Sequence, residues 1–116
     1  MVINIMLLIA ATSCEEGKAP TPEDILVGHW AVYEPIPKNP TSIEFGHNGV
    51  IKISQSINGE KMCKTGVWKL NYSIITIQLP DDSYKIHIEQ LGRKELWFHD
   101  RNQVLNKAMR VGRSNY

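Results

Sequence analysis

Apolar and polar residues alternate along most of this chain in short runs, and turn-forming residues separate the runs at regular intervals. Between residues 74 and 80, for example, Ile75, Ile77 and Leu79 alternate with Thr76 and Gln78. A period of two places one set of side chains on one face of a β-strand. From residue 14 onward the chain has three alanines against eleven isoleucines and six valines, a balance that favours strands. The pattern therefore predicts an all-β fold.

Clusters of Gly, Pro, Asn and Asp divide this region into segments of strand length. The expected strands are residues 28–34, 41–46, 49–57, 60–71, 73–79, 83–91, 94–100 and 103–111. Gly66 is expected to mark a bulge or bend in the long fourth strand. One helical turn is expected before the first strand, with Thr21 as N-cap, Pro22 at the first helical position and Asp24 completing a capping box.

Each predicted strand has one apolar and one polar face, which indicates a curved sheet around a single core. Eight antiparallel strands joined by short turns can close as an up-and-down barrel, because an even number lets the last strand pair antiparallel with the first. An incompletely closed barrel and a two-sheet sandwich are the alternatives. The side chains expected in the barrel interior, where they could line a ligand site, are Phe45, Ile53, Trp68, Ile77, Tyr84, Ile86, Leu96 and Phe98.

The first 13 residues are uncharged and contain an apolar run at 3–11. That length suits the core of a signal peptide and is too short for a membrane span of roughly 20 residues. The run ends in Ala11-Thr12-Ser13-Cys14, which resembles a bacterial lipobox. The resemblance implies that Cys14 becomes the mature N-terminus and carries a diacylglycerol on its sulfur. A buried N-terminal strand or helix is the alternative.

These boundaries divide the chain into a lipoprotein signal peptide (1–13), an acidic tether (14–24) and a barrel domain (25–112). The expected location is the cell envelope of a Gram-negative bacterium, with the lipid anchor in the outer membrane and the domain facing the periplasm or the cell surface. Glu15 and Glu16, directly after the cysteine, resemble the surface-export signals of some lipoproteins.

Two Gly-x-Trp motifs give the barrel region a family resemblance. Gly28-His29-Trp30 opens the first strand, and Gly66-Val67-Trp68 lies in the fourth. Residues 25–111 resemble the short lipocalin-like domains of bacterial lipoproteins. The resemblance implies that Gly28 turns the chain into the first strand, that Trp30 plugs the closed end of a barrel and that Arg110 packs over this tryptophan. An Arg110 side chain in solvent is the alternative.

The sequence contains no nucleophile elbow, phosphate-binding loop or Cys–His signature, so no enzyme and no cofactor are expected. His87 and His99 lie on adjacent predicted strands near Glu89 and Asp100, but their spacing matches no metal motif, and no metal site is expected. A net charge of +1 gives no reason to expect a nucleic acid partner.

Cys63 is the second cysteine of the chain, and it falls within a predicted strand. A lone thiol in a strand is usually a small buried hydrophobe, so we expect Cys63 to be buried. Pairing with Cys14 is the alternative if Cys14 carries no lipid.

Two functions fit these expectations. The first is a lipocalin-like barrel, anchored to the membrane by lipid, that binds a small hydrophobic ligand. The second is a packed barrel that acts as a structural, protein-interaction or inhibitor module. Trp97, which faces away from Leu96 and Phe98, is then a candidate contact for a partner protein, or else a cover for a neighbouring loop.

Overall fold

The computed structural model describes residues 20–36 and 39–114, so the predicted signal peptide and Cys14 lie outside the described residues. A short helix, α1, runs from Pro22 to Leu26. Thr21 caps it as predicted: its hydroxyl accepts a bond of 3.1 Å from the Asp24 backbone, and the Asp24 carboxylate accepts one of 3.1 Å from the Thr21 backbone. None of the helices in this part of the chain has the length and hydropathy needed to cross a bilayer.

Eight strands follow, each beginning and ending within two residues of its predicted bounds. They are β1 (Gly28–Glu34), β2 (Thr41–Phe45), β3 (Val50–Ile57), β4 (Glu60–Asn71), β5 (Ile74–Leu79), β6 (Asp82–Leu91), β7 (Glu95–His99) and β8 (Leu105–Gly112).

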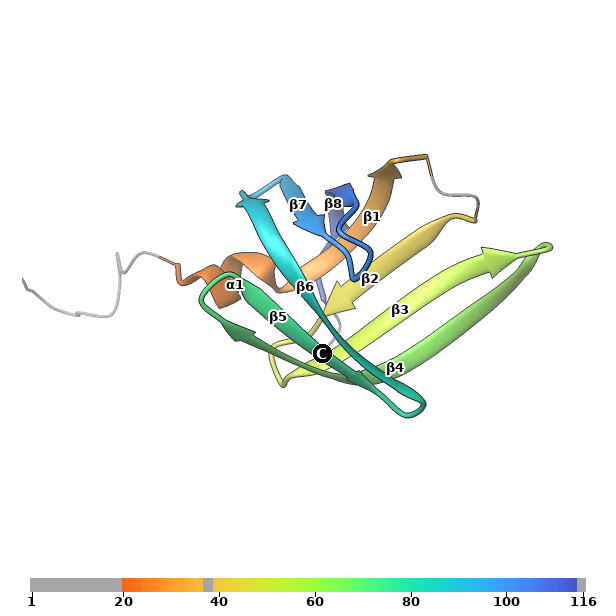
Figure 1. Ribbon diagram of the computed structural model, residues 1–116, viewed down its shortest axis with the longest axis horizontal. Helices are drawn as coiled ribbons and strands as arrows, with labels where there is room; N and C mark the ends of the chain where they lie inside the picture. The colour runs from red at the N-terminus through yellow and green to blue at the C-terminus, as the bar shows by residue number, and fades with distance from the viewer. Residues whose placement is uncertain (1–19, 37–38, 115–116) are drawn as a thin grey trace, which may run out of the picture.

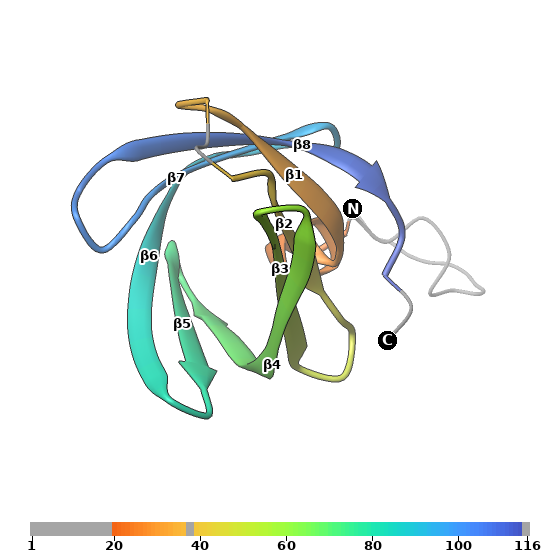
Figure 2. The same cartoon turned by 90° about the vertical axis from the view of Figure 1, so that its right-hand side faces the viewer.

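The strands form one closed antiparallel barrel in sequence order. Each strand pairs with the next, and β1 completes the ring by pairing with β8, with Trp30 opposite Arg110 and Val32 opposite Ala108. Figure 1 shows α1 at one end of the barrel, and Figure 2 shows the ring of strands from the opposite end. The predicted up-and-down barrel is confirmed, and the open barrel and the sandwich are excluded.

The inward-facing side chains form a single core. Its buried members are Leu26, Trp30, Ile43, Phe45, Ile51, Trp68, Ile75, Ile77, Leu79, Ile86, Leu96, Phe98 and Ala108. Phe45 and Trp68 meet edge to face with ring centroids 5.2 Å apart, and the Trp68 indole donates to the Gly46 carbonyl at 3.0 Å. Leu26 reaches this core from α1, so the helix covers one end of the barrel, which we call the closed end.

Trp30 and Arg110 hold the closed end together. Trp30 is fully buried, and its indole N–H donates to the Leu26 carbonyl at 2.8 Å. The guanidinium of Arg110 lies 4.4 Å from the centroid of the Trp30 ring, not in solvent. It also donates to the backbone carbonyls of Arg93 and Val27 at 2.6 and 2.8 Å, and to that of Ile25. One side chain therefore joins β8, the β6–β7 turn and α1.

Gly28 makes room for this arrangement. Its φ of +149° lies where residues with a side chain are rarely found, and a Cβ atom would stand 2.1 Å from Nη1 of Arg110. The glycine is therefore required both by its backbone conformation and by the approach of the guanidinium.

Gly66 was predicted to mark a bulge or a bend in β4, and the bulge is excluded. The register between β3 and β4 runs without a shift from Val50–Val67 to Ile57–Glu60. Gly66 instead permits a close approach, because a Cβ atom there would lie 2.1 Å from the Gln78 carbonyl oxygen. Pairing between β4 and β5 begins one residue later, at Val67 and Gln78.

The prediction that Cys63 is buried is wrong. Cys63 is a free, exposed cysteine on the outer face of the long β3–β4 hairpin, with its sulfur 3.4 Å from the Ser54 hydroxyl. Its strand parity points it away from the core, and residues 60–66 of β4 precede the first pair with β5. The local sequence shows a strand, but it does not show that this half of the hairpin extends past its neighbour.

We expect Gly66→Ala to destabilise the barrel, because the new methyl group meets backbone that cannot move without breaking the β4–β5 pairing. The expected loss is ~1–3 kcal/mol of unfolding free energy, measured by equilibrium denaturation. Gly92→Ala is the matched control, since the nearest atom to its Cβ would be 3.9 Å away. Equal stability of the two variants would contradict the close approach at Gly66.

Arg110→Ala should lower the unfolding free energy by roughly 3 kcal/mol, because three carbonyls lose a charged donor and Trp30 loses its cation. Arg110→Lys should recover only part of this, since an ammonium cannot reach all three carbonyls at once. The exposed Arg113→Ala serves as the control, with an expected change within about 0.5 kcal/mol. A wild-type melting temperature for Arg110→Ala would refute this role.

Candidate functional site

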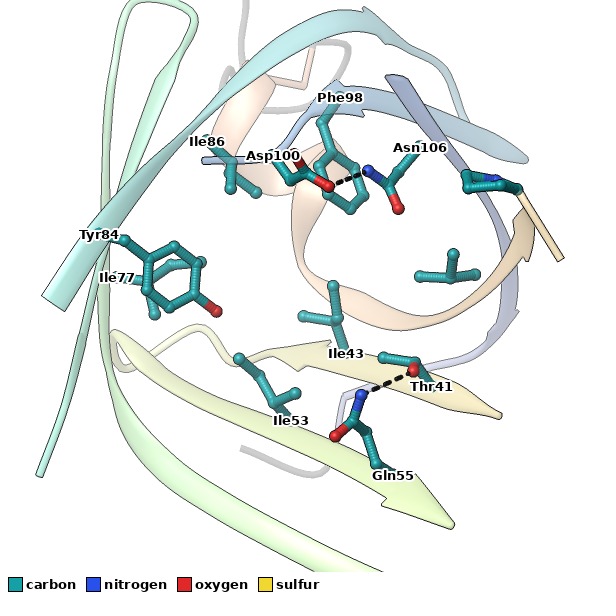
Figure 3. Close-up of a pocket in the computed structure, with 12 residues that line it drawn as sticks. Thr41, Ile43, Ile53, Gln55, Ile77, Tyr84, Ile86, Phe98, Asp100 and Asn106 are labelled. Atoms are coloured by element: carbon teal, nitrogen blue, oxygen red, sulfur yellow. Dashed lines mark hydrogen bonds between the residues drawn. The ribbon is translucent and has the colours of Figure 1, made fainter. Parts of the chain in front are cut away.

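A cavity opens at the end of the barrel opposite α1, where β1, β3, β5 and β7 finish. We call this end the mouth. The cavity has a volume of about 280 Å³, near the lower end of the usual range for small-molecule sites, roughly 300–1,000 Å³. Its lining is formed by Val32, Pro35, Thr41, Ile43, Ile53, Gln55, Ile77, Tyr84, Ile86, Phe98, Asp100 and Asn106. Figure 3 shows these side chains.

The floor and walls of the cavity are apolar. Ile77, Ile86 and Phe98 are only 1%, 2% and 5% exposed, so they belong to the core and also face the cavity. Ile43 and Ile53, opposite each other on β2 and β3, form the facing wall. Such a surface favours the hydrocarbon part of a ligand, because burying apolar area contributes about 25 cal/mol per Å².

The sequence-predicted interior residues divide between the two ends. Five of the eight line the cavity: Ile53, Ile77, Tyr84, Ile86 and Phe98. The other three, Phe45, Trp68 and Leu96, are buried in the core but do not line this cavity. The barrel is thus filled on the helix side and open on the other.

Four polar side chains surround the cavity above the apolar floor, and we call them the polar ring: Thr41, Gln55, Asp100 and Asn106. They form two hydrogen-bonded pairs, visible in Figure 3. The Gln55 amide donates to the Thr41 hydroxyl at 3.2 Å, and the Asn106 amide donates to the Asp100 carboxylate at 3.0 Å.

The polar ring was not predicted from the sequence, although the spacing of its four residues contains a signal. Each member lies two residues from an inward-facing apolar residue on the same side of its strand: Thr41 from Ile43, Gln55 from Ile53, Asp100 from Phe98 and Asn106 from Ala108. The same alternation, continued beyond the last inward-facing apolar residue of each strand, places these polar side chains on the inner face.

Asp100 is held by the β7–β8 turn. One carboxylate oxygen accepts backbone bonds from Asn102 at 2.8 Å and Val104 at 3.1 Å, and the other accepts the Asn106 amide. Burial raises the pKa of the Asp100 carboxyl, but the bonds from Asn106, Val104 and Asn102 together outweigh it, so the pKa lies below its ordinary value. The carboxylate is therefore ionised at neutral pH.

Tyr84 points into the cavity from β6. Burial raises the pKa of its phenol above the ordinary value, and the nearby Arg101 opposes part of this rise. The Arg101 guanidinium lies 4.1 Å from the centroid of the Tyr84 ring and pairs with Asp82. Tyr84 therefore stays protonated at neutral pH, and its hydroxyl is available to donate or accept a hydrogen bond.

The histidines form no metal centre in the described residues, where no group of three potential metal ligands occurs. His87 and His99 are register partners on β6 and β7, as the sequence indicated, and His99 lies 3.8 Å from the Glu89 carboxylate. The carboxylate of Asp100 instead bonds within its own turn and to Asn106.

Trp97 faces outward as predicted, but its neighbours cover it. Its indole donates to the Glu95 carboxylate at 2.8 Å, and the Lys107 ammonium lies 4.2 Å from its ring centroid. The Tyr33 hydroxyl donates to the same Glu95 carboxylate at 2.6 Å. These local contacts occupy the polar edge and one face of the ring, which makes Trp97 a weak candidate for contacting a partner protein.

Comparison with known proteins supports the fold. No protein-family model matches the sequence, and no curated protein matches it. Among solved structures, the chain is similar to a lipocalin-like protein from Bacteroides uniformis, with 15% sequence identity and a TM-score of 0.54. The match covers 78% of this chain and 98% of that one. The chain therefore has the lipocalin-like fold: an eight-stranded closed barrel with a short helix at its closed end.

Proposed function

We propose that this protein is a lipid-anchored envelope protein that binds one small, largely apolar molecule in the cavity at its barrel mouth and catalyses no reaction. One observation carries the proposal: the open cavity of about 280 Å³ whose apolar floor is surrounded by the polar ring. Concave, mostly apolar sites with a few convergent polar groups are the usual form of a small-molecule site. The cavity favours ligand binding over the alternative of a fully packed barrel.

The closed end supports this role by making the floor rigid. The cavity lies directly above a core that Trp30, Arg110 and α1 hold in place. A preformed site costs less ordering on binding than one that must assemble around its ligand. The volume suits an aromatic ring with a short chain better than the paired acyl chains of a membrane lipid.

The lining also suits binding better than catalysis. It contains neither cysteine nor histidine, and the Thr41 hydroxyl accepts a bond from the Gln55 amide, which is no general base. Nucleophilic catalysis requires a base within hydrogen-bond reach of the nucleophile. The polar ring is therefore suited to orienting a bound molecule.

The proposed anchor rests on the sequence around Cys14, which lies outside the described residues. The described chain begins beside α1, at the closed end (Figure 1). Residues 14–19 span at most about 20 Å even when fully extended. A lipid on Cys14 would hold the closed end toward the membrane, and the mouth would open away from it.

Filling the cavity should abolish binding. We expect Ile53→Trp to weaken the affinity for 3-phenylpropan-1-ol at least about tenfold, because the bulky indole occupies the volume that the ligand would take. Calorimetry on purified protein measures this, with circular dichroism to confirm the fold.

Val111→Trp is the control for this test, since Val111 is 54% exposed on β8 and does not line the cavity. It should bind as the wild type does. Undiminished binding by Ile53→Trp would place the ligand elsewhere, and a wild-type protein that binds no apolar probe would refute the proposed function.

Metabolic labelling with a palmitate analogue should mark the protein, and Cys14→Ala should abolish the label, because the lipobox-like segment directs acylation to this sulfur. Cys63→Ala is the matched control and should retain the label, even though Cys63 is exposed. An unlabelled wild-type protein would contradict the anchor and leave the cavity proposal intact.

A further inference from the structure

We infer that the mouth cavity selects small amphipathic amines over carboxylates of the same shape. The hydrocarbon part would lie on the apolar floor, and the ammonium group would bind at Asp100. This inference rests on the proposed function and adds the chemical class of the ligand.

The charge of the cavity lining favours a cationic head group. Among its twelve residues Asp100 is the one carboxylate, and there is no lysine, arginine or histidine. An anionic head group placed in the polar ring would meet a negative charge in a partly desolvated site, where like charges repel more strongly than in water. A cationic head group would meet a charge of opposite sign.

Three cations on the strands and turns around the mouth are paired with other carboxylates. Lys64 lies 3.3 Å from Asp81, Lys107 lies 3.4 Å from Glu34, and Arg101 pairs with Asp82. The donors to Asp100, by contrast, are backbone and side-chain amides. These three cations therefore have carboxylate partners of their own, while the Asp100 carboxylate accepts its hydrogen bonds from neutral amides.

The hydrogen-bond capacity of the polar ring points the same way. A carboxylate offers about four lone-pair sites, and the three donors above leave room on the Asp100 oxygen that faces Asn106. Both amide hydrogens of Asn106 are used, one by Asp100 at 3.0 Å and one by the Val104 carbonyl at 2.9 Å. The side-chain carbonyl oxygen of Asn106 is therefore the group that can bind a ligand, and it is an acceptor. An ammonium group has three donors and no acceptor, which matches this set.

Phe98 adds an aromatic surface beside the same point. It is the register partner of Asn106, and Asp100 follows it by two residues on the same face. Its ring lies near the Asp100–Asn106 pair in Figure 3. A cation near an aromatic ring gains ~0.5–2 kcal/mol, depending on how far it is desolvated. The carboxylate, the amide oxygen and the ring therefore all lie on the side of the cavity formed by β7, β8 and their turn, where the ammonium group would bind.

Three probes with the same hydrocarbon test the inference: 3-phenylpropylamine, 3-phenylpropan-1-ol and 3-phenylpropionate, titrated calorimetrically against the purified wild-type protein at pH 7. We expect the amine to bind tightest and the carboxylate weakest, with a difference between the two of at least about tenfold. Added salt should weaken the amine more than the alcohol, since only the amine pairs with a charge.

A matched pair of variants tests the role of Asp100. Asp100→Asn should lower the ratio of amine to alcohol affinity by about tenfold, because it removes the charge and keeps the shape. Asp81→Asn makes the same change at an exposed mouth carboxylate paired with Lys64, and it should leave the ratio unchanged. An equal effect of both variants would indicate a general field at the mouth and overturn the assignment to Asp100.

The outcomes separate the two proposals. If the carboxylate binds as tightly as the amine or more tightly, the amine preference is overturned. The proposed function would still be supported by the probes that bind. Failure of all three probes would overturn both. The ranking in the wild-type protein decides the matter even if Asp100→Asn does not fold.

Discussion

Arg110 donates hydrogen bonds to backbone carbonyls at the end of the short helix α1. A helix of five residues leaves its last carbonyls without intrahelical donors. Arg110 supplies donors to the Ile25 and Val27 carbonyls from the neighbouring strand, and Trp30 supplies one to Leu26. Because Trp30 and Arg110 are also register partners where β1 meets β8, the contacts that satisfy the helix also close the ring. The barrel and its plug are therefore one structural unit.

Because the core is packed at the closed end, the mouth of the barrel can hold polar side chains. Large side chains, including Trp30, Phe45 and Trp68, fill the helix side and provide the core that the fold needs. The inward-facing positions nearest the mouth therefore need not all be apolar. There the same strand parity that brings Ile43 and Ile53 inward brings Thr41 and Gln55 inward as well, and the interior changes from packed hydrocarbon to a polar opening.

The strand pattern could be predicted because alternation and turn chemistry are local, so Asn-Gly turns and period-two runs placed all eight strands within two residues. The errors came from relations between distant segments. Whether Cys63 is buried depends on how far β4 extends past β5, and the need for Gly66 comes from the Gln78 carbonyl. Polar side chains at strand ends look like turn residues in a sequence, which is why Asp100 and Asn106 were not recognised as cavity residues.

The residues that close the barrel differ from the polar residues that surround the cavity at its mouth. Fold alone does not determine a ligand, and here the barrel is closed by Trp30 and Arg110, which do not line the cavity. The polar ring contributes two hydrogen-bonded pairs at the mouth and little of the core. Substitutions at these four positions can therefore change the charge and hydrogen-bond pattern offered to a ligand without loosening the Trp30–Arg110 closure. If the cavity binds the small amphipathic molecule proposed above, these four side chains are the ones that would select its head group.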